Sequence, residues 1–355
     1  MAAPYADFVI DARTGEVLHA TNADTRLHPA SLTKMMTLYI AFEAIEHGEI
    51  SLDTMVTVSK LAASQPPSRL GLRAGQKIAL RYLIRAAAIK SANDAAMAIG
   101  DAIEGDKVSF AKRMNRTAKA LGMTNTTFRN PNGLTEAGHL STARDMVTLG
   151  RRLFYDFPQY YGIFSRRTAD AGMAQVASTN RRFLDSYEGA DGIKTGYTAP
   201  AGFNLVASAQ RGDKRIIASI FGGTSTAMRN ARMADLLDLG FGKAPNRAKE
   251  QKPPAIDYMA HADEVPATED LLAEAVAADV DPNNPPAAKT LRLATAVEES
   301  PFPKARGAKP QTVAETDGAD AAIADEAVEM AAATDKLMAS MQDTIAAAVE
   351  DAQDT

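Results

Sequence analysis

Residues 204–221, NLVASAQRGDKRIIASIF, decide the fold class. Two runs rich in Val, Ile and Ala flank Gly212-Asp213, a dipeptide typical of turns, so this stretch predicts a β-hairpin. A second hairpin is predicted near the N-terminus, where Phe8-Val9-Ile10 and Val17-Leu18 flank a segment with Gly15 at a left-handed turn position. We expect the early and late strands to share one sheet, with the residues between them forming a helical insert.

The helical patterns lie mostly in that insert and just after the last strand. One helix is expected from Ser31 to about His47, where Gly48 would stop it, and further helices are expected over 79–104 and 107–121. Met233 to Leu239 predict a final helix that ends before Gly240. The region up to Lys243 therefore mixes α and β structure.

The two parts of the chain carry opposite charge. Residues 1–243 hold 30 Lys and Arg against 22 Asp and Glu, a balance of +8, whereas residues 244–355 hold 9 against 22, a balance of −13. Only Tyr258 and Phe302 supply Phe or Tyr beyond Lys243, so the second part has little with which to organise a core. We expect three segments: a catalytic domain over 1–243, a disordered linker rich in Pro, Ala and acidic residues over 244–318, and an acidic amphipathic helix over 319–355.

The terminal helix is predicted by apolar residues at helical spacing, namely Met330, Leu337, Met341, Ile345 and Val349. Its expected role is oligomerisation or contact with a protein partner, although an isolated, partly frayed helix is an equal alternative. A membrane anchor is doubtful because the polar face is acidic rather than basic. The first residues lack a basic start and an apolar stretch, so we interpret them as the end left after removal of a signal peptide.

Composition and motifs exclude several classes of chemistry. The chain has no cysteine, its five histidines form no H-E-x-x-H zinc motif, and no serine lies in a G-x-S-x-G turn. There is no glycine-rich phosphate loop, and the basic residues do not alternate with aromatics as on a nucleic-acid platform. We expect no metal, no other cofactor and no nucleic-acid partner.

The remaining candidate is Ser31-Leu32-Thr33-Lys34. Residues three apart share a helix face, so the Lys34 amine can reach the Ser31 hydroxyl and act as its base without a histidine. Lysine can do this only if burial and a nearby positive charge lower its pKa towards neutrality. After Pro29-Ala30, the N–H of Ser31 lies at a helix start and is free to face a developing oxyanion.

By itself this spacing is weak evidence, because Ser109-Phe110-Ala111-Lys112 has it too. Order along the chain separates the two, since only Ser31 precedes Ser91-Ala92-Asn93, which in turn precedes Lys194-Thr195-Gly196. These three motifs together match the active-site set of penicillin-binding proteins and class A β-lactamases. Ser109 is interpreted as part of an ordinary helix face, and Ser178-Thr179-Asn180 as a chance copy of the second motif.

Over residues 5 to about 242 the chain resembles the low-molecular-mass D-alanyl-D-alanine carboxypeptidases. Longer stretches carry the resemblance in the family's order: PASLTKMMT from Pro29, SANDA from Ser91, NPNGL from Asn130, STARDM from Ser141 and DGIKTGYT from Asp191. The resemblance implies an α/β (α+β) fold of the β-lactamase and transpeptidase kind, an antiparallel sheet flanked by helices with an all-helical subdomain. The site would lie in the cleft between the two.

The resemblance also implies roles for individual residues. Ser31 would attack the carbonyl of the penultimate D-alanine, and Lys34 would accept its proton. Ser91, bridging Lys34 and Lys194, would pass a proton to the departing amine, and Asn93 would hold the substrate amide and orient Lys34.

The substrate carboxylate would be bound by residues of the third motif. Lys194 and Thr195 would hold it, with the charge of Lys194 keeping Lys34 neutral, and Gly196 would leave room for the substrate backbone beside the strand. The N–H groups of Ser31 and Tyr197 would form the oxyanion hole. Arg181 matches the place of a further arginine near that carboxylate, although Arg182 stands where the family has asparagine.

The expected activity is removal of the terminal D-alanine from peptidoglycan stem pentapeptides, with inhibition by β-lactams, in the periplasm or another extracytoplasmic compartment. Three alternatives remain: a D,D-endopeptidase that cleaves cross-links, a β-lactamase, and a non-catalytic penicillin-binding sensor. The β-lactamase is disfavoured because Glu104, Glu136 and Glu188, the glutamates between the second and third motifs, begin no E-x-x-L-N-like pattern. The C-terminal part also departs from relatives that carry a second, all-β domain and a basic anchor.

Overall fold

The computed structural model describes residues 4–256, and the chain divides into two units at Ala287/Ala288, so every described residue belongs to the first unit. The segment 319–355, where an amphipathic helix was expected, and most of the linker expected over 244–318 lie outside the described residues. Within residues 4–256, no helix is both long and apolar enough to cross a membrane.

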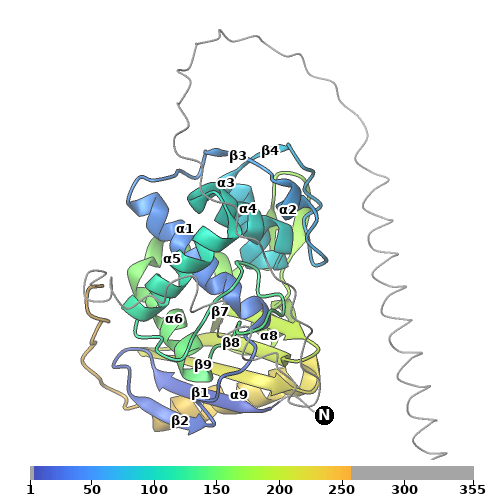
Figure 1. Ribbon diagram of the computed structural model, residues 1–355. Helices are drawn as coiled ribbons and strands as arrows, with labels where there is room; N and C mark the ends of the chain where they lie inside the picture. The colour runs from blue at the N-terminus through green and yellow to red at the C-terminus, as the bar shows by residue number, and fades with distance from the viewer. Residues whose placement is uncertain (1–3, 257–355) are drawn as a thin grey trace, which may run out of the picture. The chain divides into compact units, whose positions relative to one another are not determined.

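A five-stranded antiparallel sheet combines the two ends of this region, as the sequence predicted (Figure 1). Its order is β2-β1-β9-β8-β7, so the first strand pairs with the last one, Ala6 opposite Phe221 and Val9 opposite Ala218. The strands are β1 (Ala6–Asp11), β2 (Val17–Thr21), β7 (Ala190–Thr198), β8 (Gly202–Arg211) and β9 (Lys214–Gly223). Two short antiparallel pairs lie outside it: β3 (Met55–Thr57) with β4 (Lys77–Ala79), and β5 (Thr168–Asp170) with β6 (Gln175–Ala177).

Side chains along the central strands point alternately to the two faces of the sheet. Both faces are apolar, and each packs into its own hydrophobic core. Val206 and Ile217 point into the larger core, which includes the insert helices, whereas Leu205 and Ile216 point into a smaller one under the last helix. The longer helices are α1 (Lys34–Glu46), α4 (Asn93–Glu104), α5 (Lys107–Ala120), α6 (Ala143–Asp156) and α9 (Thr226–Lys243). The shorter helical segments are η1 (Ala30–Thr33), α2 (Lys60–Ala63), α3 (Leu80–Arg85), η2 (Ala86–Lys90), α7 (Pro158–Tyr161), η3 (Gly162–Ser165) and α8 (Arg181–Ser186).

The helical pattern predicted over 79–104 is present in the structure, but the chain breaks it at Ser91. Ser91 has φ +65° and ψ +32°, a left-handed conformation that interrupts the helical ladder between η2 and α4. The N–H of Asn93 instead donates to Ser68 O at 2.7 Å. The second motif therefore lies on a tight corner between two helices.

The final helix is longer than predicted. It begins after Ser225, whose hydroxyl accepts the N–H of Met228, and continues through Gly240 to Lys243. Gly240 does not end it, because this glycine allows close contact with the sheet: a Cβ there would lie 2.6 Å from Ile216 Cγ2.

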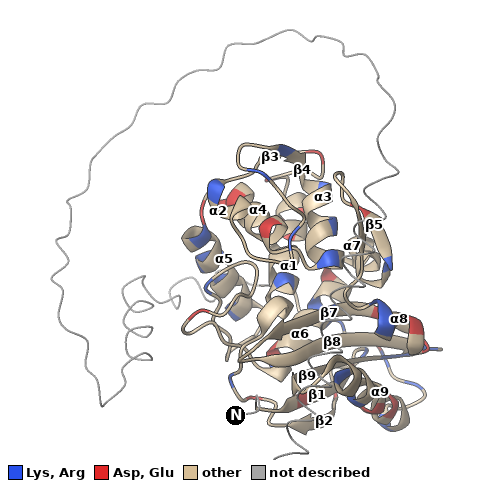
Figure 2. Ribbon diagram, turned by 90° about the vertical axis from the view of Figure 1, so that its right-hand side faces the viewer, with Lys and Arg blue, Asp and Glu red and all other residues tan. Residues whose placement is uncertain are grey.

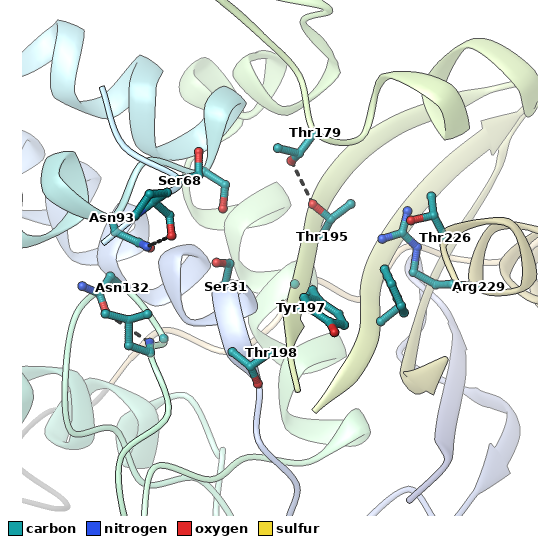
Figure 3. Close-up of a pocket in the computed structure, with 16 residues that line it drawn as sticks. Ser31, Ser68, Asn93, Asn132, Thr179, Thr195, Tyr197, Thr198, Thr226 and Arg229 are labelled. Carbon is teal, nitrogen blue, oxygen red and sulfur yellow. Dashed lines mark hydrogen bonds between the residues drawn. The ribbon is translucent and has the colours of Figure 1, made fainter. Parts of the chain in front are cut away.

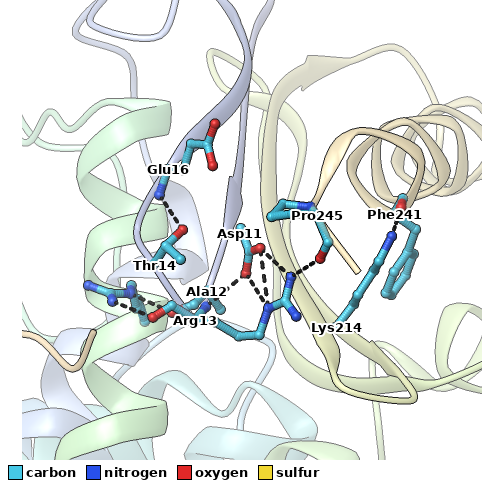
Figure 4. Close-up of polar contacts among 9 residues, drawn as sticks. Asp11, Ala12, Arg13, Thr14, Glu16, Lys214, Phe241 and Pro245 are labelled. Atoms are coloured by element: carbon cyan, nitrogen blue, oxygen red, sulfur yellow. Dashed lines mark hydrogen bonds and ion pairs between the residues drawn. The ribbon is translucent and has the colours of Figure 1, made fainter. Parts of the chain in front are cut away.

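Ordered contacts continue past Lys243 to Ile256, in a segment that we call the strap (residues 244–256). The guanidinium of Arg13 bonds the Asp11 carboxylate and donates to Pro245 O at 2.7 Å (Figure 4). Gln251 N–H donates to Arg13 O at 2.8 Å, and Arg152 donates to Pro254 O at 2.7 Å. The strap thus binds the start of the sheet and helix α6.

Candidate active site

Ser31 lies in η1, directly before helix α1, as the motif predicted. Strand β7 passes very close to this turn: a Cβ on Gly196 would lie 3.0 Å from Pro29 O and 3.1 Å from Ser31 N. Gly196 therefore gives room to the backbone that carries the nucleophile, in addition to the room expected for a substrate. On the other side, Gly133 has φ +83°, and a Cβ there would lie 1.9 Å from Ala30 O. The serine turn is thus packed between two backbone segments that approach it closely at glycine positions.

The Lys34 amine is fully buried and contacts the Ser31 hydroxyl, with Nζ 2.9 Å from Oγ. Nζ also donates to two carbonyl oxygens, Asn93 Oδ1 at 2.8 Å and Asn132 O at 2.6 Å. Carbonyl oxygens can only accept, so they occupy two N–H groups, and a neutral amine then directs its lone pair at the serine hydroxyl. Burial, and secondly the charge of Lys194, lower the pKa of Lys34 well below its usual range, while Asp94 opposes this.

The second motif reaches the cleft from the helical side. Lys194 Nζ donates to Ser91 Oγ at 2.8 Å, and Asn93 holds Lys34 through Oδ1 while its Nδ2 donates to Pro66 O at 3.0 Å. The expected bridge from Ser91 to Lys34 is not among the hydrogen bonds of the described residues, so Ser91 is joined to Lys194 alone. The corner at Ser91 brings its hydroxyl to the strand that carries Lys194.

Lys194 and Thr195 lie on β7 opposite the serine. Lys194 is 1% exposed, and burial, followed by the charge of Arg229, lowers its pKa from 10.5 to about 7. Its amine also donates to Thr195 O at 2.9 Å, and Thr195 Oγ1 lies 2.8 Å from Thr179 Oγ1. Thr179 belongs to the copy of the second motif that we had set aside, so that stretch contributes to the site after all.

Residues of all three motifs line one cavity of about 350 Å³ between the helical insert and the edge of the sheet (Figure 3). Ser31, Ser91, Asn93, Thr195, Gly196 and Tyr197 all line it. The Tyr197 side chain is 56% exposed at its rim and packs on Phe203, with ring centroids 4.4 Å apart. Among residues 4–256, no three His, Asp or Glu side chains are placed to hold a metal ion.

Two arginines differ from the expectation. Arg181 does not line the cavity; its exposed side chain pairs with Asp185 at 3.3 Å. Arg229, which sequence reasoning missed, lines the cavity from the first turn of α9 and is 4% exposed. Burial lowers the pKa of Arg229 to about 10, and its guanidinium donates to the neutral amide of Asn230. No local pattern marks Arg229, because only the pairing of β7, β8 and β9 brings α9 to the cleft.

Ser109 and two of the glutamates considered for a β-lactamase make structural contacts outside the cavity. Ser109 lies on α5 outside the cavity and donates its hydroxyl to Asp106, as part of a helix cap. Of the three glutamates considered for a β-lactamase, none lines the cavity. Glu136 pairs with Lys107 at 2.9 Å, and Glu104 with Arg113 at 3.1 Å.

Comparison with known proteins identifies the family that the three motifs indicated. Residues 3–225 match the D-alanyl-D-alanine carboxypeptidase family. The chain is 40% identical over 240 residues to D-alanyl-D-alanine carboxypeptidase DacF of Bacillus subtilis, covering 66% of this chain and 61% of that protein. It is 41% identical over 239 residues to DacC of Escherichia coli, covering 66% of this chain and 60% of that protein. The matched part thus spans about 60% of the length of these curated relatives.

Solved structures agree in fold as well as in sequence. Penicillin binding protein 5 of Haemophilus influenzae superposes with a TM-score of 0.65 at 32% identity, over 68% of this chain and 72% of that one. The ampicillin-bound penicillin-binding protein D2 of Listeria monocytogenes gives 0.61 at 34% identity, over 66% and 96%. With the motifs in one cleft, the family match over most of the described region and these shared folds, the chain belongs to the D-alanyl-D-alanine carboxypeptidase family.

Proposed function

We propose that this chain is a serine-type D-alanyl-D-alanine carboxypeptidase that removes the terminal D-alanine from peptidoglycan stem pentapeptides through an ester on Ser31. One observation carries the proposal: the buried Lys34 amine lies 2.9 Å from Ser31 Oγ, with its remaining hydrogen-bonding capacity directed to two carbonyl oxygens. This arrangement supplies a neutral base for the hydroxyl without a histidine. Because the substrate is in the cell wall, we place the enzyme in the periplasm or another extracytoplasmic compartment.

In the proposed first step, Ser31 Oγ attacks the carbonyl carbon of the penultimate D-alanine while Lys34 takes the hydroxyl proton. The N–H groups of Ser31 and Tyr197 stabilise the developing oxyanion. When the tetrahedral intermediate collapses, the C–N bond breaks and Ser91 passes a proton from the Lys194 ammonium, to which it is bonded, to the departing amine. Water then attacks the ester and gives a proton back to Lys194 through Ser91. Lys34 returns its proton to Ser31 Oγ, so the shortened peptide leaves and the starting enzyme is restored.

The substrate carboxylate fits the end of the cavity near Thr195 and Arg229. Arg229 is a buried cation bonded to a neutral amide, and an incoming carboxylate gives it a charged partner. Lys194 adds charge at the same end, with a pKa of about 7 that the bound carboxylate would raise. We therefore assign the carboxylate to Thr195, Lys194 and Arg229, and give Arg181 no part in binding it.

The test is to incubate the protein with benzylpenicillin and map the adduct, and separately to measure D-alanine released from a D-alanyl-D-alanine peptide. We expect a long-lived penicilloyl adduct on Ser31 and stoichiometric release of D-alanine. Ser31→Ala should abolish both, whereas Ser109→Ala, which removes the serine of the other S-x-x-K copy, should leave both unchanged. An adduct on Ser109, or rapid turnover of penicillin, would refute the assignment.

A further inference from the structure

A second basin adjoins the catalytic cavity at the end away from Ser31. It has a volume of about 360 Å³ and shares Thr179, Thr226 and Arg229 with the cavity. In Figure 3, Thr226 and Arg229 lie on the opposite side of Thr195 from Ser31. Arg229, one of the residues proposed to hold the substrate carboxylate, therefore also lines this basin.

The basin has an excess of positive charge. Three arginines line it, Arg181 and Arg182 from the first turn of α8 and Arg229 from α9, and no acidic side chain is among the lining residues. Figure 2 shows that α8 and α9 each carry both basic and acidic positions. Asp185 lies nearby, but it is shared between Arg181 at 3.3 Å and Arg167 at 2.8 Å. Arg182 is exposed and makes no side-chain hydrogen bond or ion pair with another residue of 4–256. The basin thus offers one arginine without a partner and one that is only partly neutralised.

From this juxtaposition we propose that the basin binds an acidic side chain on the leaving-group side of the scissile bond. This inference rests on the proposed chemistry at Ser31. If Thr195 and Arg229 hold the carboxylate of the leaving residue, the side chain of that residue begins beside Arg229, which lines both the cavity and the basin. The methyl group of D-alanine leaves the basin empty, whereas a longer side chain with its own anionic group fills it and meets Arg182.

The substrate class is therefore a D-alanyl peptide that ends in an acidic D-amino acid. The chemistry is unchanged: the amide bond between the D-alanyl carbonyl and the amine of that residue breaks, the Ser31 ester forms, and the amine leaves with one proton. Hydrolysis of the ester then completes the cleavage. The enzyme would thus release a C-terminal acidic D-amino acid by the same carboxypeptidase reaction that releases D-alanine.

The experiment compares three synthetic peptides that share the same acylated L-lysyl-D-alanyl part and end in D-alanine, D-glutamate or D-glutamine. D-Glutamate and D-glutamine have almost the same shape, so the ratio of their kcat/KM values isolates the charge. We expect the wild-type enzyme to favour D-glutamate over D-glutamine by roughly tenfold at low salt, and by less at 0.5 M NaCl, because one or two partly exposed ion pairs contribute about this much.

Arg182→Gln should lower that ratio to roughly two while the hydrolysis of the peptide ending in D-alanine stays within about twofold, because this variant removes one exposed cation. Arg182→Lys should keep most of the preference. Arg116→Gln, an exposed arginine of α5 outside both cavities, is the matched control and should keep all of it.

The outcomes separate this inference from the proposed function. A wild-type ratio near one, with D-alanine released normally, would overturn the basin's role and leave the carboxypeptidase intact. A preference that persists unchanged in Arg182→Gln would overturn it as well. Failure to hydrolyse any of the three peptides would instead count against the proposed function itself.

Discussion

Replacing Lys194 by methionine should change how the fold's stability depends on pH. In the folded protein the pKa of Lys194 is about 7, because the amine is buried, whereas a lysine in an unfolded chain titrates near 10.5. Between these two values the unfolded chain binds more protons than the folded one, so the free energy of unfolding rises with pH across this window. The slope from this one group approaches about 1.4 kcal/mol per pH unit. Below about pH 7 the penalty is constant, and above about pH 10.5 it vanishes.

The assay is urea unfolding of the wild type and Lys194→Met at pH 7, 8 and 9, with Lys112→Met, an exposed lysine of α5, as the control for losing one lysine. Relative to Lys194→Met, the wild type should gain roughly 2 to 3 kcal/mol from pH 7 to pH 9. The methionine keeps much of the buried volume while removing the charge. Parallel curves for the wild type and Lys194→Met would show that Lys194 titrates alike in the folded and unfolded states, and the reasoning from burial would then be wrong.

Three further results are expected. In the pH profile of D-alanine release, kcat/KM should fall above about pH 7, because Lys194 of the free enzyme loses its proton there. The corresponding fall in kcat should occur at higher pH, because the bound substrate carboxylate raises the pKa of Lys194. A kcat/KM that climbs steadily to pH 10 would contradict this. Gly133→Ala should lower the rate of acylation by penicillin at least tenfold, because its Cβ would lie 1.9 Å from Ala30 O and the turn that carries Ser31 must shift. An unchanged rate would show that the backbone at Gly133 does not fix the position of this turn. A chain ending at Ile256 should keep its thermal midpoint within a few degrees. A chain ending at Lys243 should melt roughly 5 °C lower, because the hydrogen bonds of the strap are lost. If calorimetry gave equal midpoints for the two chains, the folded part would end at Lys243.

The parts of the fold that depend on local pattern could be predicted. Hairpins show themselves by strand-forming runs around turn residues, which is why β8 and β9 were found within a few residues of their bounds. The break at Ser91 could not be found this way, because its neighbours have good helix propensity and the left-handed conformation is fixed by tertiary contacts such as the bond from Asn93 N to Ser68 O. Gly240 was misjudged for a related reason, since a glycine within a helix can serve close packing rather than termination.

The same distinction applies to the site. Ser31 and Lys34 are neighbours on one turn, so their contact follows from spacing alone. Lys194 and Ser91 are 103 positions apart, and only the family resemblance connected them before the structure did. Thr179 and Arg229 escaped because their places are set by the packing of α8 and α9 around the sheet, for which no short motif exists. Arg181, chosen by its position in the sequence, does not line the catalytic cavity and instead pairs with Asp185.

The position of the strap also determines where the folded part can be attached to a solid support. It ends against β1 and α6, and Pro253 and Pro254 border a hollow that has no residue in common with the lining of the catalytic cavity. A chain shortened to Ile256 and coupled to a solid support through that end would keep its cleft open to solution. If Ser31 forms the proposed long-lived penicilloyl ester, such an immobilised protein would capture β-lactams from a flowing sample, so the strap also supplies a handle for a single-use antibiotic detector.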